Sequence, residues 1–288
     1  MQIETHEEPK RFAADYASWR SWTEDERQRM MAEWDKEMDA VGVVILSAAM
    51  SPEQCDRFVA LIDEEIRGAS KIEKQMNENR LSHKGYTVYN LQGRHPLFLE
   101  HIAYPPIVDY FRRFLGESMA LHSSEARVTP HGTGDAHWHY DGYDRIPDYF
   151  LSMNSLHYLC DSTEENGATR YIPGTHKSFL PVEEAKRLQH RYLNVKKGDI
   201  VLFNPYLIHS GSANLSGKPR PIVINYYQRS YIKQEFDYYH MLGYMERRKL
   251  TDEQKKLLGF DHFTAADIHE LYMISKGDNK LEDMNPYA

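Results

Sequence analysis

The chain has 288 residues, with 35 Lys plus Arg against 43 Asp plus Glu and a formal net charge of −8, which disfavours nucleic-acid binding and a polybasic membrane anchor. No apolar run approaches the ~20 residues that cross a bilayer, and the N-terminus lacks a signal-peptide pattern. Cys55 and Cys160 are too few for a disulfide framework, so the composition predicts a cytoplasmic protein with reduced thiols.

The first 118 residues are predicted to be mainly helical, with one early strand. Apolar side chains recur at helical spacing over residues 25–40, and the β-branched run 41–46 predicts a short strand. Ser51 and Gln54 then form a capping box around Pro52, which predicts a helix to about residue 67 with Cys55 on its core face.

Two further segments complete this N-terminal part. Residues 68–85 are polar and predict a surface loop. A helix is predicted over residues 105–115, ending at Gly116.

Residues 119–232 contain short β-branched or alternating runs separated by turn sequences such as PHGTGD and KKGD, a pattern typical of a sandwich or barrel. The helical segments lie before and after these runs, which disfavours a parallel α/β sheet. The predicted strands are ALHSSEARV, AHWHYD, SMNSLHYL, RYLNV, DIVLFN and PIVINYYQ.

The last part, residues 233–288, is predicted to be helical. A capping box at 251–254 begins a helix that stops at Gly259, and Thr264 begins a second helix through Ile274. No linker or repeat interrupts the chain, so we expect residues 1–288 to form a single domain.

The stretch His137-Trp138-His139-Tyr140-Asp141 suggests a metal site. Residues two apart on a strand project to the same face, so His137, His139 and Asp141 would share one space. Histidine plus carboxylate with open positions suits non-haem Fe(II). The best candidate for a further ligand is His209, which follows an apolar strand.

Arg220 lies eleven residues after His209, at the entry to the strand PIVINYYQ. An arginine that faces the interior of a barrel needs a carboxylate partner, and its planar fork can bind one through two hydrogen bonds.

These features together resemble the phytanoyl-CoA dioxygenase type of Fe(II)/2-oxoglutarate-dependent dioxygenases. The resemblance covers residues 40–232 and rests on the ordered set of His139-x-Asp141, the segment 166–177 with its NG and PGTHK motifs, the strand GDIVLF, His209 and Arg220. It implies a double-stranded β-helix, or jelly roll, within a mainly β fold with flanking helices. The single domain would then be an oxygenase domain.

The resemblance also implies roles for individual residues. His139, Asp141 and His209 would bind Fe(II), and Arg220 would hold the distal carboxylate of 2-oxoglutarate. With O₂, such an enzyme oxidises an unactivated C–H bond of a small metabolite and releases succinate and CO₂. Because halogenating relatives lack the carboxylate, Asp141 favours hydroxylation, desaturation or rearrangement.

Several other residues are candidates near this site. Asn154 has the parity of a cofactor-facing strand residue and is predicted to touch 2-oxoglutarate. Ile222, Ile224 and Tyr226 share the inward parity of Arg220, so Tyr226 is predicted to line the pocket. His137, Tyr143 and Tyr149 are predicted, with Tyr226, to contact the substrate.

Two other functions remain open. One is a cupin-like metal enzyme that uses His137, His139 and His209 and needs no 2-oxoglutarate. The other is a catalytically silent small-molecule-binding protein on the same fold. The sequence has no basic cluster that would indicate CoA or phosphate, which favours a small metabolite, in secondary metabolism, as substrate. We expect a monomer or homodimer.

Overall fold

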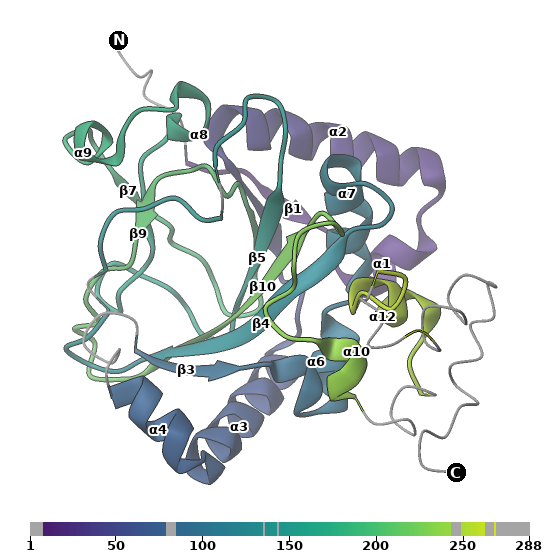
Figure 1. The fold of residues 1–288 in the computed structure, drawn as a ribbon. Coiled ribbons are helices and arrows are strands. Elements are labelled where there is room, and N and C mark those ends of the chain that lie inside the picture. Colours follow the sequence, from purple (N-terminus) through teal and green to yellow (C-terminus); the bar gives the residue numbers. More distant parts are fainter. Residues whose placement is uncertain are drawn as a thin grey trace.

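The structure is a computed structural model that describes residues 8–78, 85–134, 136–142, 144–242, 249–262 and 268. Two β-sheets form its core (Figure 1). The large sheet has the strand order β1 (Arg11–Ala13), β2 (Val43–Ser47), β8 (Ile200–Phe203), β5 (Ser152–Tyr158), β10 (Arg220–Gln228), β4 (Ala120–Thr129) and β3 (Tyr86–Tyr89). The small sheet has the order β7 (Arg191–Tyr192), β6 (Arg170–Tyr171) and β9 (His209–Ser210).

All strand pairs in the two sheets are antiparallel except β1 with β2. The central strand β10 pairs with β4 on one side and with β5 on the other, although these strands are far apart in the sequence. The predicted fold class, a mainly β jelly roll with flanking helices, is confirmed.

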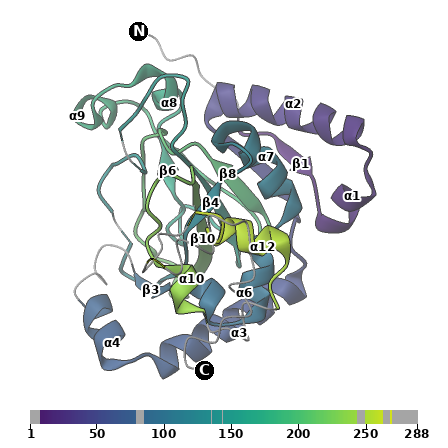
Figure 2. The same ribbon diagram turned by 45° about the vertical axis from the view of Figure 1, so that its right-hand side comes forward.

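Helices cover the large sheet on the side away from the small sheet, where α2 and α7 lie next to its strands (Figures 1 and 2). The helices are α1 (Tyr16–Ser21), α2 (Glu24–Val41), α3 (Pro52–Gly68), α4 (Lys71–Glu78), η1 (Leu91–Gly93), α6 (Pro96–His101), α7 (Pro105–Leu115), α8 (Thr175–Ser178), α9 (Val182–Ala185), α10 (Tyr238–Met241) and α12 (Asp252–Leu257). The predicted helices at 25–40, 52–67, 105–115 and after Thr251 are therefore confirmed. The helix predicted from Thr264 falls almost wholly outside the described residues.

The alternation of side chains along β10 divides the apolar core into two layers. Val223 and Tyr227 pack in the cluster that includes the helices, and the Tyr227 hydroxyl donates to the carbonyl of Ile102 at 2.8 Å. Ile222 and Ile224 belong to the cluster between the two sheets. The inward parity expected for the residues after Arg220 is confirmed, because a strand directs successive side chains to opposite faces.

The surface loop predicted over residues 68–85 is partly wrong, because α4 occupies Lys71–Glu78. A capping box begins this helix: Glu73 N donates to the Ser70 hydroxyl, and Ser70 N donates to the Glu73 carboxylate. The helix does not bury an apolar stripe, since Ile72 is 71% exposed and Met76 is 41% exposed. The buried Asn77 attaches it to β3 instead, through two hydrogen bonds with the backbone of Thr87.

One of the predicted strands is shorter than expected. Of the run RYLNV, only Arg191–Tyr192 forms a strand, and the next backbone hydrogen bonds go to loop residues Ser162 and Thr169.

Within the described part of the chain, every helix is too short or too polar to cross a bilayer.

Candidate metal centre and adjoining cavities

The stretch 136–141 was predicted as a strand, and the structure corrects this. It forms an isolated bridge to β9, in which the backbone N–H groups of His139 and His209 each donate to the other residue's carbonyl, at 2.9 and 2.8 Å. The ladder does not continue because a turn precedes β9, and Asp141 N donates to the carbonyl of Pro205 instead. This single bridge brings residues seventy positions apart side by side.

His139, Asp141 and His209 form a cluster that can hold a metal ion. Each offers one ligand atom, and these atoms all lie within 4.8 Å of one another. Nε2 of His139 is 3.6 Å from Oδ1 of Asp141, and Nε2 of His209 is 3.6 Å from Oδ2. Two histidines and one carboxylate, with further positions free, form the donor set of mononuclear non-haem iron sites.

The histidine tautomers also suit a metal. Nδ1 of His139 lies 2.8 Å from the carbonyl of His137, and Nδ1 of His209 lies 3.0 Å from the carbonyl of Leu207. A carbonyl only accepts, so each Nδ1 carries the proton and each Nε2 presents its lone pair to the cluster. Burial, reinforced by the neighbouring His209 and opposed by Asp141, lowers the pKa of His139 to about 4, so its imidazole is neutral at pH 7.

Asn154 contacts the carboxylate of this cluster. Its Nδ2 donates to Oδ2 of Asp141 at 2.6 Å, while its Oδ1 is buried without a hydrogen-bond partner. The amide on β5 therefore orients the Asp141 carboxylate. Its predicted contact with 2-oxoglutarate stays a prediction.

We expect Asn154→Ala to weaken Fe(II) binding by about 10–100-fold without abolishing it, because outer partners of a metal ligand contribute on that scale. Anaerobic titration against a competing chelator measures the dissociation constant. Ser152→Ala, on the same strand, is the control and should bind Fe(II) as the wild type does. Equal affinity in Asn154→Ala and the wild type would show that the amide does not support the ligand.

A cavity of about 180 Å³ adjoins the cluster, and we call it the metal-side cavity. Its lining includes all three residues of the cluster, the glycines Gly134 and Gly211, and Arg220. Gly134 has φ +101, and a Cβ there would lie 2.5 Å from the Thr129 side chain. The backbone can therefore follow this wall only with glycine at that position.

Arg220 carries a buried positive charge with little compensation. Arg220 is the first residue of β10, pairs with Thr129 of β4 and is 6% exposed. One nitrogen donates to the Thr129 hydroxyl at 3.4 Å, whereas Nε and Nη1 are buried and have no partner among the described residues. Burial lowers its pKa below the ordinary value. A buried guanidinium with two unused donors needs an anion, and a carboxylate of 2-oxoglutarate meets that need.

Other cations near the site are already engaged. Arg170 donates to the Ser210 hydroxyl and the Gly211 carbonyl and lies over the Trp138 ring. Arg229 donates to the carbonyls of Phe150 and Phe114. Neither lines the metal-side cavity, so Arg220 is better placed to bind a carboxylate there.

The remaining predicted site residues lie at different distances from the cluster. Tyr226 lines the metal-side cavity, as its parity predicted. His137 is exposed and does not belong to the metal-capable cluster found among the described residues. Tyr149 is 37% exposed, with its hydroxyl 2.8 Å from that of Tyr231. Tyr143 lies outside the described residues. Substrate contact by these residues stays a prediction.

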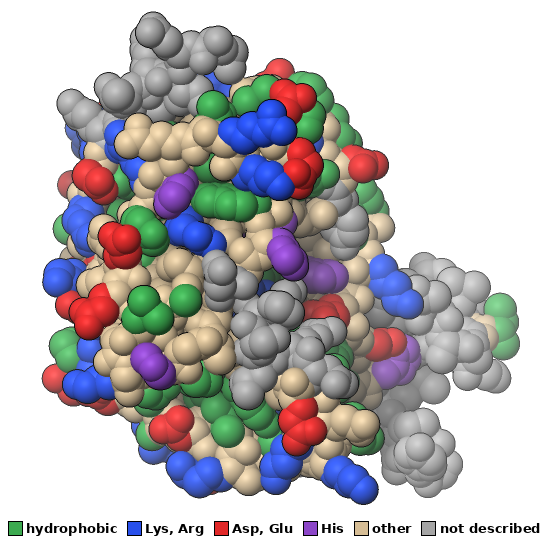
Figure 3. All heavy atoms as spheres, turned by 90° about the vertical axis from the view of Figure 1, so that its left-hand side faces the viewer, with side chains coloured by type: hydrophobic (Ala, Val, Ile, Leu, Met, Phe, Trp, Pro, Cys, Tyr) green, Lys and Arg blue, Asp and Glu red, His purple; other side chains and the backbone are tan. Residues whose placement is uncertain are grey.

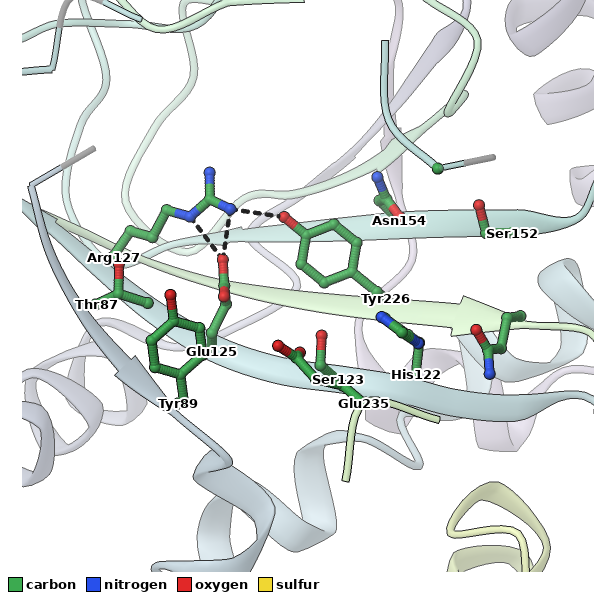
Figure 4. A pocket seen from close by; sticks show the side chains of 12 residues that line it. Thr87, Tyr89, His122, Ser123, Glu125, Arg127, Ser152, Asn154, Tyr226 and Glu235 are labelled. Atoms are coloured by element: carbon green, nitrogen blue, oxygen red, sulfur yellow. Dashed lines mark hydrogen bonds and ion pairs between the residues drawn. The ribbon is translucent and has the colours of Figure 1, made fainter. Parts of the chain in front are cut away.

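Sequence reasoning missed Glu125 and Arg127 on β4, which form an ion pair beside the site (Figure 4). Arg127 also donates to the Tyr226 hydroxyl at 3.0 Å. Burial lowers the pKa of Arg127, but Glu125, Tyr226 and Asp141 together outweigh burial and raise the pKa above the ordinary value. The available signal was two opposite charges at i and i+2 in a predicted strand, which places both on one face.

Comparison with known proteins agrees with this geometry. The family profile described as Phytanoyl-CoA dioxygenase (PhyH) matches residues 38–222. The chain is 28% identical over 261 residues to "Dioxygenase trt7" of Aspergillus terreus, which covers 84% of this chain and 88% of that protein.

Solved structures share the fold. HygX from Streptomyces hygroscopicus, solved with nickel and 2-oxoglutarate bound, superposes with a TM-score of 0.54 at 16% identity, over 74% of this chain and 89% of HygX. SnoK, described as a non-heme alpha ketoglutarate dependent carbocyclase from nogalamycin biosynthesis, gives a TM-score of 0.56 at 17% identity, over 76% of this chain and 87% of SnoK.

Proposed function

This chain belongs to the phytanoyl-CoA dioxygenase family and is an Fe(II)/2-oxoglutarate-dependent dioxygenase, and from that premise we propose that His139, Asp141 and His209 bind the Fe(II) and that Arg220 binds the distal carboxylate of 2-oxoglutarate. The observation that carries the proposal is the guanidinium of Arg220, buried with two unpartnered nitrogens in the cavity that the metal-capable cluster also lines.

Each residue has a defined part in this arrangement. Fe(II), 2-oxoglutarate and O₂, when bound, supply the oxidising chemistry that acts on a C–H bond and yields succinate and CO₂. His139 and His209 offer neutral nitrogen ligands, and Asp141 offers an anionic oxygen held by Asn154. Three ligands leave positions for the cosubstrate and O₂. Arg220 fixes the far end of the cosubstrate and so its orientation.

The enzyme acts on a small molecule. We propose that it hydroxylates, desaturates or rearranges a metabolite of a secondary pathway, because Asp141 occupies the position that halogenating relatives leave open. The similarity to SnoK, described as a carbocyclase from nogalamycin biosynthesis, supports the inclusion of rearrangement.

The cupin-like alternative is less well supported. It requires His137 as a ligand with His139 and His209, but Asp141 is the residue whose oxygens lie 3.6 Å from both of the other ligand atoms. Arg220, with its unpartnered nitrogens, would also have no role in an enzyme without 2-oxoglutarate.

Three expectations about partners and location stay predictions: the absence of nucleic-acid and membrane partners, a monomeric or homodimeric state, and a cytoplasmic location. On the face shown in Figure 3, basic and acidic side chains are interspersed and histidine side chains are visible near the centre. A nucleic-acid-binding face would instead carry a continuous basic patch. This mixed face supports the absence of a nucleic-acid partner on that side of the molecule.

Turnover of 2-oxoglutarate tests the proposed function. Incubated with Fe(II), 2-oxoglutarate and O₂, the wild-type protein should form succinate, and the rate should rise when a correct substrate is added. Asp141→Ala is the control, because it removes a ligand. Succinate formation no faster in the Fe(II)-loaded wild type than in Asp141→Ala would refute the proposal and favour a catalytically silent binding protein.

A further inference from the structure

A second cavity, of about 370 Å³, lies against the same strands as the metal-side cavity (Figure 4). We call it the polar cavity. It is lined by Thr87, Tyr89, His122, Ser123, Glu125, Arg127, Gly142, Ser152, Asn154, Tyr226, Gln228 and Glu235.

The two cavities share a wall. Arg127 and Tyr226 line both of them, and Asn154, which lines the polar cavity, contacts the Asp141 carboxylate. The strand register explains this, since Tyr226 of β10 stands opposite Asn154 of β5 and Ser123 of β4. A molecule in the polar cavity therefore lies beside the metal-capable cluster, where a substrate would need to be.

The lining of the polar cavity is unusually hydrophilic for a small-molecule site. No Ala, Val, Leu, Ile or Met is among the described residues that line it, and its rings are those of Tyr89, Tyr226 and His122. Ligand sites usually have a mainly hydrophobic lining with a few polar groups. This lining does not suit a fatty-acyl chain or another largely apolar substrate.

The charges of the polar cavity favour a cation. Arg127 and His122 are the basic side chains among the described residues that line it, and the Glu125 carboxylate, 2.6 Å from Arg127, already neutralises the arginine. Glu235, which lies after β10, is exposed, and the described residues offer its carboxylate no ion pair. The Lys, Arg, Asp and Glu side chains of the described lining therefore sum to a net negative charge, and none of them is a free cation for a phosphate or CoA group.

Three buried lining groups have no hydrogen-bond partner among the described residues: two are amide oxygens, and the third is Nδ1 of His122, which accepts or donates according to its tautomer. Oδ1 of Asn154 and Oε1 of Gln228 are buried without partners. Their amide orientations are fixed, because the NH₂ of Asn154 donates to Asp141 and the NH₂ of Gln228 donates to the carbonyl of Ile232 at 2.6 Å. Amide oxygens only accept, so a ligand that satisfies them must bring hydroxyl or N–H donors.

We propose that the polar cavity is the substrate site and that its substrate is a small polyhydroxylated amine, with hydroxyl groups that donate to Asn154 and Gln228 and an ammonium group near Glu235. This inference rests on the proposed function, because it places the substrate beside the Fe(II) that His139, Asp141 and His209 would bind. It narrows the substrate from any small metabolite to a cationic, donor-rich one.

Three methyl glycosides that differ in one substituent test the proposal: methyl glucosaminide, methyl glucoside and methyl glucuronide. Each is titrated by calorimetry into anaerobic protein loaded with Fe(II) and 2-oxoglutarate, so the readout is binding and not turnover. We expect the glucosaminide to bind about tenfold more tightly than the glucoside, a difference of about 1.4 kcal/mol, and the glucuronide to bind most weakly.

Glu235→Gln should remove most of this preference and leave 2-oxoglutarate binding unchanged, since Glu235 does not line the metal-side cavity. The charge-matched control is Glu117→Gln, whose side chain is 91% exposed and which does not line the polar cavity; it should keep the preference. Tighter binding of the glucuronide, no binding of the glucosaminide up to about 10 mM, or an unchanged preference in Glu235→Gln would each overturn the substrate class.

The same samples separate this inference from the proposed function. Absorption of the Fe(II)–2-oxoglutarate complex reports cosubstrate binding before any glycoside is added. If that absorption forms and the glycosides show no preference for the amine, the substrate class alone is wrong. If it does not form, the proposed function fails first.

Discussion

Replacing His139, Asp141 or His209 with Ala is expected to abolish turnover and to weaken Fe(II) binding by more than about 100-fold. Loss of an outer partner of a metal ligand already costs 10–100-fold, roughly, and each of these changes removes a ligand itself. The three candidate ligand atoms lie within 4.8 Å of one another. Each substitution removes one of them and leaves the metal with two protein donors. Iron content and an anaerobic Fe(II) titration measure the effect.

His137→Ala is the matched control for this series. It removes an exposed histidine two residues from a ligand, and the Nδ1 contact of His139 is to the backbone carbonyl of His137, which the substitution keeps. Fe(II) affinity should therefore stay within about twofold of the wild type. Loss of iron in His137→Ala, with iron retained in Asp141→Ala, would contradict the ligand assignment and favour a three-histidine site.

Arg220→Ala is expected to weaken 2-oxoglutarate binding by at least about tenfold. A hydrogen bond to a charged group contributes roughly 1.5–3 kcal/mol, and a guanidinium can make two to one carboxylate. Because ~1.4 kcal/mol corresponds to a factor of ten, loss of one such bond already gives the expected change. Titration of 2-oxoglutarate into the anaerobic Fe(II) protein measures it.

Two comparisons make the Arg220 result specific. Arg220→Lys should recover only part of the affinity, because a point charge cannot reproduce the two-pronged geometry. Fe(II) affinity in Arg220→Ala should equal that of the wild type, since Arg220 is not a ligand. An unchanged dissociation constant for 2-oxoglutarate in Arg220→Ala would mean that another group holds the cosubstrate.

The sequence predicted best those elements whose side chains alternate between two environments. The parity of β10 placed Ile222, Ile224 and Tyr226 toward the cavity, and the structure confirms it. The capping boxes at Ser51 and Thr251 also marked the start of α3 and α12 correctly. In these segments local propensity and burial favour the same structure.

The errors arise where long-range contacts decide the structure. Helix α4 has a capping box at Ser70, but its apolar side chains Ile72 and Met76 are exposed. The sequence therefore lacks the helical spacing of core residues that would have predicted this helix. The stretch around His139 alternates as a strand does, yet the turn before β9 limits it to one bridge. The polar cavity as a whole could not be predicted from the sequence, because its walls combine residues of β3, β4, β5 and β10.

Anaerobic addition of 2-oxoglutarate to the Fe(II)-loaded protein tests the central claim most directly. A keto acid that chelates the iron gives a metal-to-ligand charge-transfer absorption, which simple carboxylate binding elsewhere does not. We predict that this absorption forms with one 2-oxoglutarate per iron in the wild type, is absent in Asp141→Ala, and needs at least about tenfold more 2-oxoglutarate in Arg220→Ala. Wild-type protein that binds one Fe(II) but shows no such absorption at saturating 2-oxoglutarate would contradict the account.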